Sequence, residues 1–393
     1  MKNFTWWNPT IVIFGKDTIP QIADQLAAVK AKSVLLVYGG KAIFKNGVYT
    51  QVTEALTKRN IAFPELGGVK SNPTIDKVRE GVARVKASPV DAVVPVGGGS
   101  VFDTAKTIAA GAFYKGDPWD FFEGKASELQ RALPIFGVLT ASATASEVNN
   151  IAVVSNPERE AKTSFNSPFI FPRVSIIDPW VQTSLPEEQT VNGGIDIMTH
   201  AMERLFDGAE GVGLMDAQGY AIVKSMIELI PELRMNPENY EARAQYAWAA
   251  SLAHNGSLSC GRGGRGDFSS HKLGHSLSLL FGVPHGASLS VMMPAWARYL
   301  HKENPTPFAR FAEAVFGAGG GGQGSDEEER ALEGIERLES FYRSVGAPTT
   351  LRELKIGEAD IERVTQNAAA FAPFGALKPL TSDDILEIYK LAY

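Results

Sequence analysis

Phe268-Ser-Ser-His271-Lys-Leu-Gly-His275-Ser-Leu-Ser-Leu-Leu-Phe-Gly-Val-Pro-His285-Gly286 contains three of the six histidines in the chain. His271 and His275 are four residues apart, so they share one face of a helix. The Gly-Val-Pro segment before His285 predicts that this helix ends and that the chain turns. A histidine pair at this spacing is often structural or exposed to solvent, but the third histidine in the turn favours a metal site.

A second pair with the same spacing lies upstream, at Asp196 and His200. Two helices with such faces could supply one carboxylate and three imidazoles to a divalent metal, and this ligand set suits Zn(II) or Fe(II). A zincin motif, His-Glu-x-x-His, is excluded because Lys272 occupies the position of the glutamate. The chain also lacks the His-Asp dipeptide that an HD-type phosphohydrolase requires. The spacing therefore predicts a metal site and leaves its chemistry open.

Composition bounds the class of protein. The 393 residues are 44% hydrophobic and 21% charged, which is typical of a globular chain of two domains. The net charge of -6 and the lack of a dense basic run argue against nucleic acid as a partner. The single cysteine, Cys260, excludes internal disulfides and indicates a reducing compartment, so we expect a cytoplasmic protein. With no signal-like N-terminus and no run of about 18 apolar residues, we expect no membrane association.

Continuous apolar runs alternate with helical patterns in the N-terminal half. Such runs are typical of strands that are buried on both faces, and their alternation with helices predicts a mostly parallel sheet covered by helices on both sides. The expected strands are residues 10–14, 33–38, 61–66, 92–96, 134–139 and 173–177.

Helical patterns dominate the C-terminal half. We place a domain boundary at residue 186, which gives an α/β nucleotide-binding domain at 1–186 and an all-helical metal-binding domain at 187–393. The glycine-rich segment 317–324 is most simply a linker between helices; a phosphate loop would require a following Gly-Lys-Ser/Thr, which is missing. The expected helices are 188–206, 211–231, 239–259, 266–280, 286–302, 306–316, 326–345, 358–370 and 381–391.

Two further segments are candidates for ligand binding. Gly97-Gly98-Gly99-Ser100 joins a buried strand to a helix, where backbone N–H groups hold phosphate oxygens. Asp103 and Lys106 follow one turn later, either near the ligand or as a solvated pair on the helix. Residues 140–147, Thr-Ala-Ser-Ala-Thr-Ala-Ser-Glu, follow another strand, where open α/β sheets place ligands. The alternative for both segments is an ordinary turn without a ligand.

Taken in order, these motifs resemble the iron-containing (group III) alcohol dehydrogenases, nearly from end to end. Within that family, the branch of butanol dehydrogenases and broad-range aldehyde reductases is the most similar. The resemblance implies a Rossmann-like N-terminal domain, an all-helical C-terminal domain, and an active site in the cleft between them, which is the dehydroquinate synthase-like architecture. It also implies a homodimer, and residues 10–14 could supply the edge strand that joins the two subunits.

The resemblance also implies roles for individual residues. Metal ligands fall on Asp196, His200, His271 and His285, while His275 is a catalytic residue beside the nicotinamide and the substrate. Many members have glycines on both sides of the residue equivalent to Thr144, where this chain has Ala143 and Ala145. The positions implied to bind the cofactor are Asn72, Gly97, Gly98, Gly99, Ser100, Asp103, Thr140, Thr144, Ser146 and Lys162.

The end of the strand at 33–38 bears on the choice of nucleotide. An acidic residue there normally binds the ribose hydroxyls of NAD and repels the 2′-phosphate of NADP. This strand ends in Gly39-Gly40-Lys41 without an acid. Lys41 and Lys45 are nearby cations, although either could simply be solvated. The strand end predicts that these residues bind the nucleotide and that NADP(H) is preferred, with NAD(H) possible.

The function predicted from all of this is a metal-dependent alcohol dehydrogenase or aldehyde reductase, with Fe(II) or Zn(II), that moves a hydride between NADP(H) and a primary alcohol or aldehyde. Two alternatives remain. One is a related enzyme such as glycerol dehydrogenase or dehydroquinate synthase, and the latter needs a strongly basic pocket to which Arg262 and Arg265 could contribute. The other is a metal-binding regulator without enzymatic activity.

Overall fold

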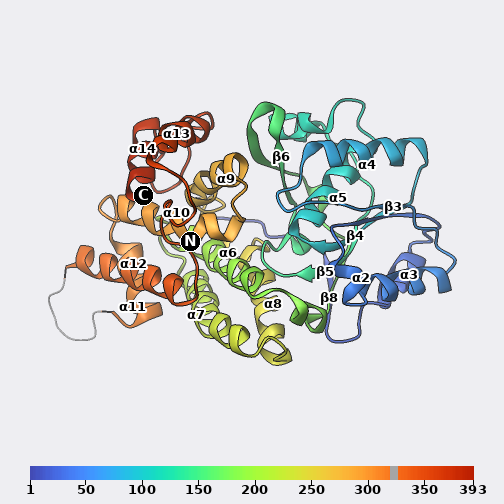
Figure 1. Ribbon diagram of the computed structural model, residues 1–393, viewed down its shortest axis with the longest axis horizontal. Helices are drawn as coiled ribbons and strands as arrows, with labels where there is room; N and C mark the ends of the chain where they lie inside the picture. The colour runs from blue at the N-terminus through green and yellow to red at the C-terminus, as the bar shows by residue number, and fades with distance from the viewer. Residues whose placement is uncertain (319–325) are drawn as a thin grey trace. The chain divides into compact units, whose positions relative to one another are not determined.

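The computed structural model describes residues 1–318 and 326–393, so most of the glycine-rich segment predicted to be a linker or phosphate loop lies outside the described residues. Figure 1 shows the course of the chain. It forms two compact units. The α/β unit comprises Trp7–Leu185 and Asn236–Ser251, and the helical unit comprises Met1–Trp6, Pro186–Met235 and Leu252–Tyr393. The helical unit thus includes one segment from before residue 186, Met1–Trp6, and the α/β unit includes one segment from after it, Asn236–Ser251.

The α/β unit is built on a six-stranded sheet of order β1-β8-β5-β4-β2-β3 in which all paired strands are parallel. The predicted parallel sheet is confirmed, although the run at 61–66 forms only a two-residue strand. The strands are β1 (Ile11–Phe14), β2 (Val34–Tyr38), β3 (Glu65–Leu66), β4 (Ala92–Gly98), β5 (Phe136–Ala141) and β8 (Val174–Ile177).

Helices cover both faces of this sheet, which explains why its central strands are apolar without alternation. The first four residues of β2 and the first six of β4 are buried. One face packs against α4 (Ile75–Ala87) and α5 (Gly99–Gly111). The other face packs against α1 (Gln21–Ala28), α2 (Ala42–Lys45) and α3 (Val48–Lys58). In Figure 1, α4 and α5 lie on the opposite side of the strands from α2 and α3.

The sequence analysis missed an antiparallel hairpin formed by β6 (Ile151–Asn156) and β7 (Ala161–Asn166). Its inward residues Ala152, Val154 and Phe165 join the core beneath α4 and α5. The hairpin contains Ser, Asn, Lys and Thr among its short strands, so its apolar alternation is weak. Its hydrogen bonds to α5 involve its backbone, because Lys106 donates to the backbone oxygen of Ile151 and Asp103 accepts from the backbone N–H of Val153.

The register of the central strands decides where the ligand-binding loops emerge. Tyr38 of β2 pairs with Val96 of β4, and Gly97 of β4 pairs with Leu139 of β5. The loops after these three strands therefore leave the sheet side by side at its carboxyl edge. The chain also reverses its direction of travel across the sheet here, between β2 and β4, and α/β sheets bind ligands at such switch points.

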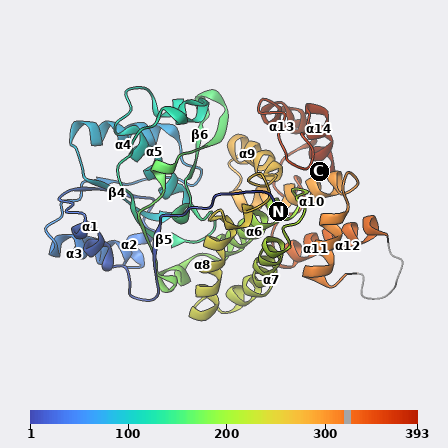
Figure 2. The ribbon, with the colours of Figure 1, turned by 180° about the vertical axis from the view of Figure 1, so that it is seen from behind.

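The C-terminal half is helical, as predicted, and Figure 2 shows its helices from behind. Each predicted helical segment corresponds to a helix of the described residues. None of those helices is long and apolar enough to cross a membrane. The helices are α6 (Glu187–Leu205), α7 (Gly213–Met235), α8 (Tyr240–His254), α9 (Ser269–Phe281), α10 (His285–Leu300), α11 (Thr306–Phe316), α12 (Glu327–Ser344), α13 (Ile361–Ala369) and α14 (Ser382–Leu391).

Candidate metal and nucleotide sites

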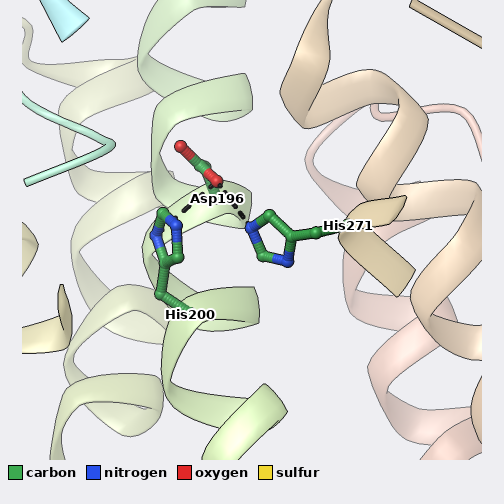
Figure 3. A group of neighbouring side chains, drawn as sticks. All are labelled: Asp196, His200 and His271. Carbon is green, nitrogen blue, oxygen red and sulfur yellow. Dashed lines mark ion pairs between the residues drawn. The ribbon is translucent and has the colours of Figure 1, made fainter. Parts of the chain in front are cut away.

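Three of the predicted metal ligands converge in the interior of the helical unit. Asp196 and His200 lie one turn apart on α6, and His271 faces them from α9, as Figure 3 shows. Each of the three offers one ligand atom, and these atoms lie within 4.8 Å of one another. All three residues are buried. Because the i, i+4 spacing places Asp196 and His200 on one helical face, the packing of α9 against that face is enough to assemble the cluster.

One oxygen of Asp196 faces three imidazole nitrogens. Its Oδ1 lies 3.6 Å from His200 Nδ1, 3.5 Å from His271 Nε2 and 3.6 Å from His285 Nε2. These separations exceed the length of a good hydrogen bond, which is about 2.7–3.2 Å. Ligand atoms that surround a tetrahedral ion at about 2.1 Å are themselves about 3.4 Å apart. The spacing thus matches donor atoms around a divalent ion.

The ring nitrogens are also available for coordination. His200 Nδ1 and His271 Nε2 are buried and have no hydrogen-bond partner among the residues that the structure describes. Burial lowers the pKa of His200 well below its usual value, although the nearby charge of Asp196 acts in the other direction. The lowered pKa keeps the ring of His200 neutral. Neutral imidazoles with an ionised carboxylate suit Zn(II) or Fe(II), so the residues fit the predicted metal.

Glycine brings the fourth predicted ligand to this cluster. His285 is the first residue of α10, and Gly286 follows it. A Cβ at Gly286 would lie 2.1 Å from the backbone oxygen of Asn192 on α6, so only glycine allows α10 to begin directly against the main chain of α6. This close approach explains why the imidazole of His285 reaches Asp196, and it gives the His-Gly dipeptide a structural reason.

Glu203 is a participant that the sequence analysis missed. Its Oε1 lies 3.0 Å from His271 Nδ1 and accepts hydrogen bonds from Ser270 Oγ at 2.6 Å and from the backbone N–H of His271 at 3.2 Å. A carboxylate acceptor at Nδ1 fixes the tautomer that leaves Nε2 free to face Asp196. Burial alone would lower the pKa of His271, but the neighbouring carboxylates of Asp196 and Glu203 outweigh burial and raise this pKa. The sequence did contain a signal for Glu203, because its i, i+7 spacing from Asp196 places both carboxylates on the same face of one helix.

The two remaining histidines of this region have different settings. His275 lies one turn after His271, half-buried, and its ring centroid is 5.6 Å from that of His285. It is not part of the group of close ligand atoms, and its catalytic role stays a prediction. His254, the last residue of α8, was not singled out from the sequence, yet its ring stacks on that of His200.

In the α/β unit, the glycines between β4 and α5 are required by packing. A Cβ at Gly97 would lie 2.5 Å from Val101 Cγ2, and one at Gly99 would lie 2.3 Å from Thr144 Oγ1. The loop after β5 therefore rests directly on the turn that begins α5. Backbone N–H groups at this helix start, including that of Ser100, are available to an anion. The predicted contacts of Gly97, Gly98, Gly99 and Ser100 with a nucleotide stay predictions.

Asp103 and Lys106 do not form a solvated pair, and that alternative is wrong. Both are buried. Lys106 Nζ donates to Ser146 Oγ at 2.8 Å, Asn149 Oδ1 at 2.9 Å and the backbone oxygen of Ile151 at 2.8 Å. Burial lowers its pKa to about 8, against the opposing charges of Asp103 and Glu147.

Asp103 completes the same network. It accepts hydrogen bonds from Ser146 Oγ at 2.6 Å and from the backbone N–H of Val153 at 3.0 Å. Burial raises its pKa, although the charge of Lys106 and the hydrogen bond from Ser146 act in the other direction. The side-chain oxygens of Asp103 and Ser146 thus form hydrogen bonds within the protein, and these bonds anchor the loop after β5. Their predicted contacts with the cofactor remain untested.

The anchored loop has an unusual backbone. Ala145 adopts φ = 53°, the left-handed region in which a Cβ is unfavourable. This is one of the two alanines that replace glycines of the resembling family. Thr140 and Thr144 are partly exposed, and Thr144 Oγ1 accepts a hydrogen bond from the backbone N–H of Ser146 at 3.2 Å. The loop therefore keeps its conformation at the cost of some backbone strain.

Other predicted nucleotide-binding residues lie around the same edge of the sheet. Lys162 Nζ, from β7, donates to Asn72 Oδ1 at 2.8 Å, so the structure brings these two together. Gly39, Gly40 and Lys41 directly follow β2. A Cβ at Gly40 would meet nothing within 4 Å among the described residues, and Lys41 is exposed.

The structure places an acidic residue beside the end of β2, although β2 and the residues that directly follow it contain none. Glu65 begins β3, which pairs with β2. One of its carboxylate oxygens accepts from Tyr38 Oη and the other from Tyr49 Oη, both at 2.7 Å. Hydrogen bonding to Glu65 raises the pKa of each tyrosine to about 12. The carboxylate is therefore already engaged by two hydroxyl groups.

Two family models cover nearly the whole chain. The model described as "Iron-containing alcohol dehydrogenase" matches residues 9–179. The model described as "Fe-containing alcohol dehydrogenase family, C-terminal" matches residues 190–393.

Individual proteins are also similar to this chain over nearly its whole length. A probable NADH-dependent butanol dehydrogenase 1 of Bacillus subtilis is 38% identical over 390 residues, which is 99% of each chain. The NADPH-dependent aldehyde reductase YqhD of Escherichia coli is 32% identical over 396 residues, covering both chains fully. Among solved structures, NADH-dependent butanol dehydrogenase A of Thermotoga maritima superimposes with a TM-score of 0.94 at 42% identity, over 100% of this chain and 99% of that one.

The metal cluster can be tested by removing two of its donors. In the double variant Asp196→Ala, His271→Ala, we expect metal affinity to fall by more than the roughly 10- to 100-fold that the loss of an outer hydrogen-bond partner costs. Metal analysis of the purified protein after loading and dialysis measures the effect. His301→Ala removes a buried histidine elsewhere in the helical unit and should keep full occupancy. Full occupancy in the double variant would show that the ion binds elsewhere.

Proposed function

The chain belongs to the iron-containing alcohol dehydrogenase family, and on this premise we propose that it moves a hydride between NADP(H) and a primary alcohol or aldehyde with the help of a divalent metal. The observation that carries the proposal is the buried oxygen of Asp196 surrounded by three imidazole nitrogens at 3.5–3.6 Å. We assign Asp196, His200, His271 and His285 as the metal ligands. Their chemistry suits Fe(II) and Zn(II) equally.

The proposal divides the work between groups of residues. A bound divalent ion acts as a Lewis acid toward the substrate oxygen, and the nicotinamide supplies or accepts the hydride. With one carboxylate and three neutral imidazoles around it, a bound divalent ion would keep a net positive charge, which would favour an oxygen ligand. The glycine turn before α5 binds the pyrophosphate through backbone N–H groups. His275, half-buried beside His285, moves the proton of the hydroxyl group.

The dehydroquinate synthase alternative is disfavoured by the setting of Arg262. This side chain is buried, and its guanidinium contacts Asp207 at 3.3 Å and Asp216 at 2.5 Å. Two carboxylates therefore neutralise a cation that a polyanionic substrate would need. Membership of an alcohol dehydrogenase family also disfavours a regulator without activity. A related alcohol such as glycerol remains a substrate to include in any assay panel.

The proposal also includes self-association and location. β1 lies at the edge of the sheet and pairs only with β8 among the described strands. Ile11 and Phe14 on this strand and Trp7 before it are exposed. An edge that is both unpaired and apolar favours a second copy of the chain as its cover, which gives a homodimer. The single cysteine favours a reducing compartment, so we place the enzyme in the cytoplasm.

The role of His275 predicts a separation between turnover and metal binding. His275→Ala should lower kcat by about 100- to 10,000-fold, the range typical of a lost general acid or base, while metal content stays at the wild-type level. Steady-state reduction of butyraldehyde together with metal analysis measures both. Loss of metal would make His275 a ligand, and an unchanged rate would reduce it to a packing residue.

The end of β2 predicts a preference for NADP(H). Gly39 and Gly40 leave room for a 2′-phosphate, and a charge-assisted contact is worth about 1.5–3 kcal/mol, or roughly 10- to 150-fold. Gly40→Asp fits sterically, since a Cβ there meets no described atom, and should shift the ratio of kcat/KM values toward NADH by repelling the phosphate. Gly40→Ser is the uncharged control.

Similarity to the relatives does not decide between the two nucleotides, because the relatives include both NADH-dependent and NADPH-dependent enzymes. The measurement of kcat/KM for each nucleotide is therefore needed. A wild-type kcat/KM for NADH that equals or exceeds the value for NADPH would contradict our reading of the strand end. The engaged carboxylate of Glu65 would then be the first residue to examine as the source of the discrimination.

The dimer can be tested at the edge strand. The N–H groups of Ile11 and Gly15 donate to β8, so by alternation the N–H of Val12 points outward. Val12→Pro removes that outward donor while it spares the bonds to β8, and edge strands tolerate such a proline. We expect light scattering to give a dimer mass for the wild type and a monomer mass for the variant. A monomeric wild type at all concentrations would refute the prediction.

A further inference from the structure

We propose that His254 is a positioning residue of the metal centre, held by Arg204 against the face of the ligand His200, and that Phe268 completes the wall behind the ligands. The inference rests on the metal site proposed above and assigns it three side chains that do not themselves coordinate. His254 ends α8, Arg204 lies on α6, and Phe268 directly precedes α9. All three belong to the helical unit.

The contact between His254 and His200 is a parallel stack. Their ring centroids are 4.4 Å apart and their planes differ by 9°. The terminal torsion of a histidine is broad, so a ligand imidazole needs neighbours that fix its rotation. A flat ring against one face restricts that rotation. The stack thus helps to hold His200 Nδ1 in its place, 3.6 Å from Asp196 Oδ1.

Arg204 explains why His254 sits there. Its guanidinium Nη2 lies 2.6 Å from His254 Nδ1, Nη1 donates to the backbone oxygen of His200 at 2.5 Å, and Nε donates to Ser259 Oγ at 3.1 Å. A guanidinium only donates, so His254 Nδ1 must accept and the ring proton lies on Nε2. One buried cation therefore binds the backbone of the ligand residue and the ring that stacks on it.

Phe268 contributes a backbone outlier to the same cluster. Its φ of 60° is left-handed, which is rare for a bulky residue. In this conformation its ring centroid lies 5.3 Å from that of His271 and 5.5 Å from that of His254, and the guanidinium of Arg204 lies 4.9 Å from it. Unfavourable backbone conformations persist where surrounding structure requires them, often at functional sites. The outlier places an aromatic ring against a second ligand just before α9 begins.

His254 is not itself a ligand in this arrangement. The group of close ligand atoms among the described residues contains Asp196, His200 and His271. The Nδ1 of His254 is already taken by Arg204. Its effect on the metal must therefore pass through His200, which makes metal affinity and ligand geometry the properties to measure.

The experiment uses the metal-free full-length protein and Co(II) as the probe, because the visible absorption of Co(II) reports ligand geometry. We compare the wild type with three variants. His254→Ala removes the ring, His254→Phe keeps a flat aromatic face without a hydrogen-bonding group, and His254→Asn keeps an acceptor for Arg204 without an aromatic face. His301→Ala is the matched control, since His301 is a buried histidine of the same unit that bonds to the backbone of Arg298.

We expect His254→Ala to bind Co(II) about 10- to 100-fold more weakly than the wild type, the range for lost outer partners of a ligand, with an altered spectrum. His254→Phe should recover most of the affinity and the spectrum, His254→Asn should not, and His301→Ala should behave as the wild type. Should His254→Ala fail to fold, the contrast between the Phe and Asn variants carries the test.

The possible failures are distinguishable. Wild-type affinity and spectrum in His254→Ala, or equal losses in His254→Ala and His301→Ala, would overturn the positioning role and leave the metal site intact. Equal Co(II) binding by the Phe and Asn variants would also overturn it, because the aromatic face would then be irrelevant. Failure of the wild type to bind Co(II) would overturn the proposed metal site itself, and this inference with it.

Discussion

The buried carboxylate of Asp196 is the constraint around which the proposed metal site is arranged. A charge removed from water is costly unless it is paired or coordinates a metal. Three imidazole nitrogens surround its Oδ1, all too distant for good hydrogen bonds. A cation among these atoms would offset the burial of the charge. The contact of α10 with α6 at Gly286 and the hydrogen bonds of Glu203 can both be understood as means to keep these donors together.

In the α/β unit, the buried charges of Asp103 and Lys106 have hydrogen-bond partners within the protein. Lys106 and Asp103 are satisfied by the protein itself, through hydrogen bonds to the loop and the hairpin that follow β5. These hydrogen bonds thus hold the loop after β5 and the β6–β7 hairpin in place. The proposed binding surface is left to glycines, small hydroxyl residues and backbone N–H groups, which suit a phosphate-containing ligand. The helical unit therefore contains the side-chain donors of the proposed metal site, and the α/β unit contains the backbone turn of the proposed nucleotide site.

Periodicity was enough to predict the parallel sheet, the helices and the spacing of the ligand pairs, because these depend on neighbouring residues. What the sequence could not supply depends on distant ones. The hairpin β6–β7 has weak alternation and gains its partners from α5. The burial of Lys106 follows from that same packing. His254 reaches the proposed metal site only through the fold, since it lies on a different helix from every predicted ligand. Glu203 is the exception, because its helical spacing from Asp196 was visible in the sequence.

The left-handed Ala145 has a consequence for how the loop after β5, which we propose to bind the nucleotide, would respond to its ligand. A glycine at this position would leave the loop many conformations in the free protein, and binding would have to select one. The Cβ of alanine removes most of them, and the network beneath fixes what remains. The loop then loses its conformational entropy when the protein folds, and not when the ligand binds. A loop prepared in this way is expected to gain little order when the cofactor arrives and to release it without rearrangement.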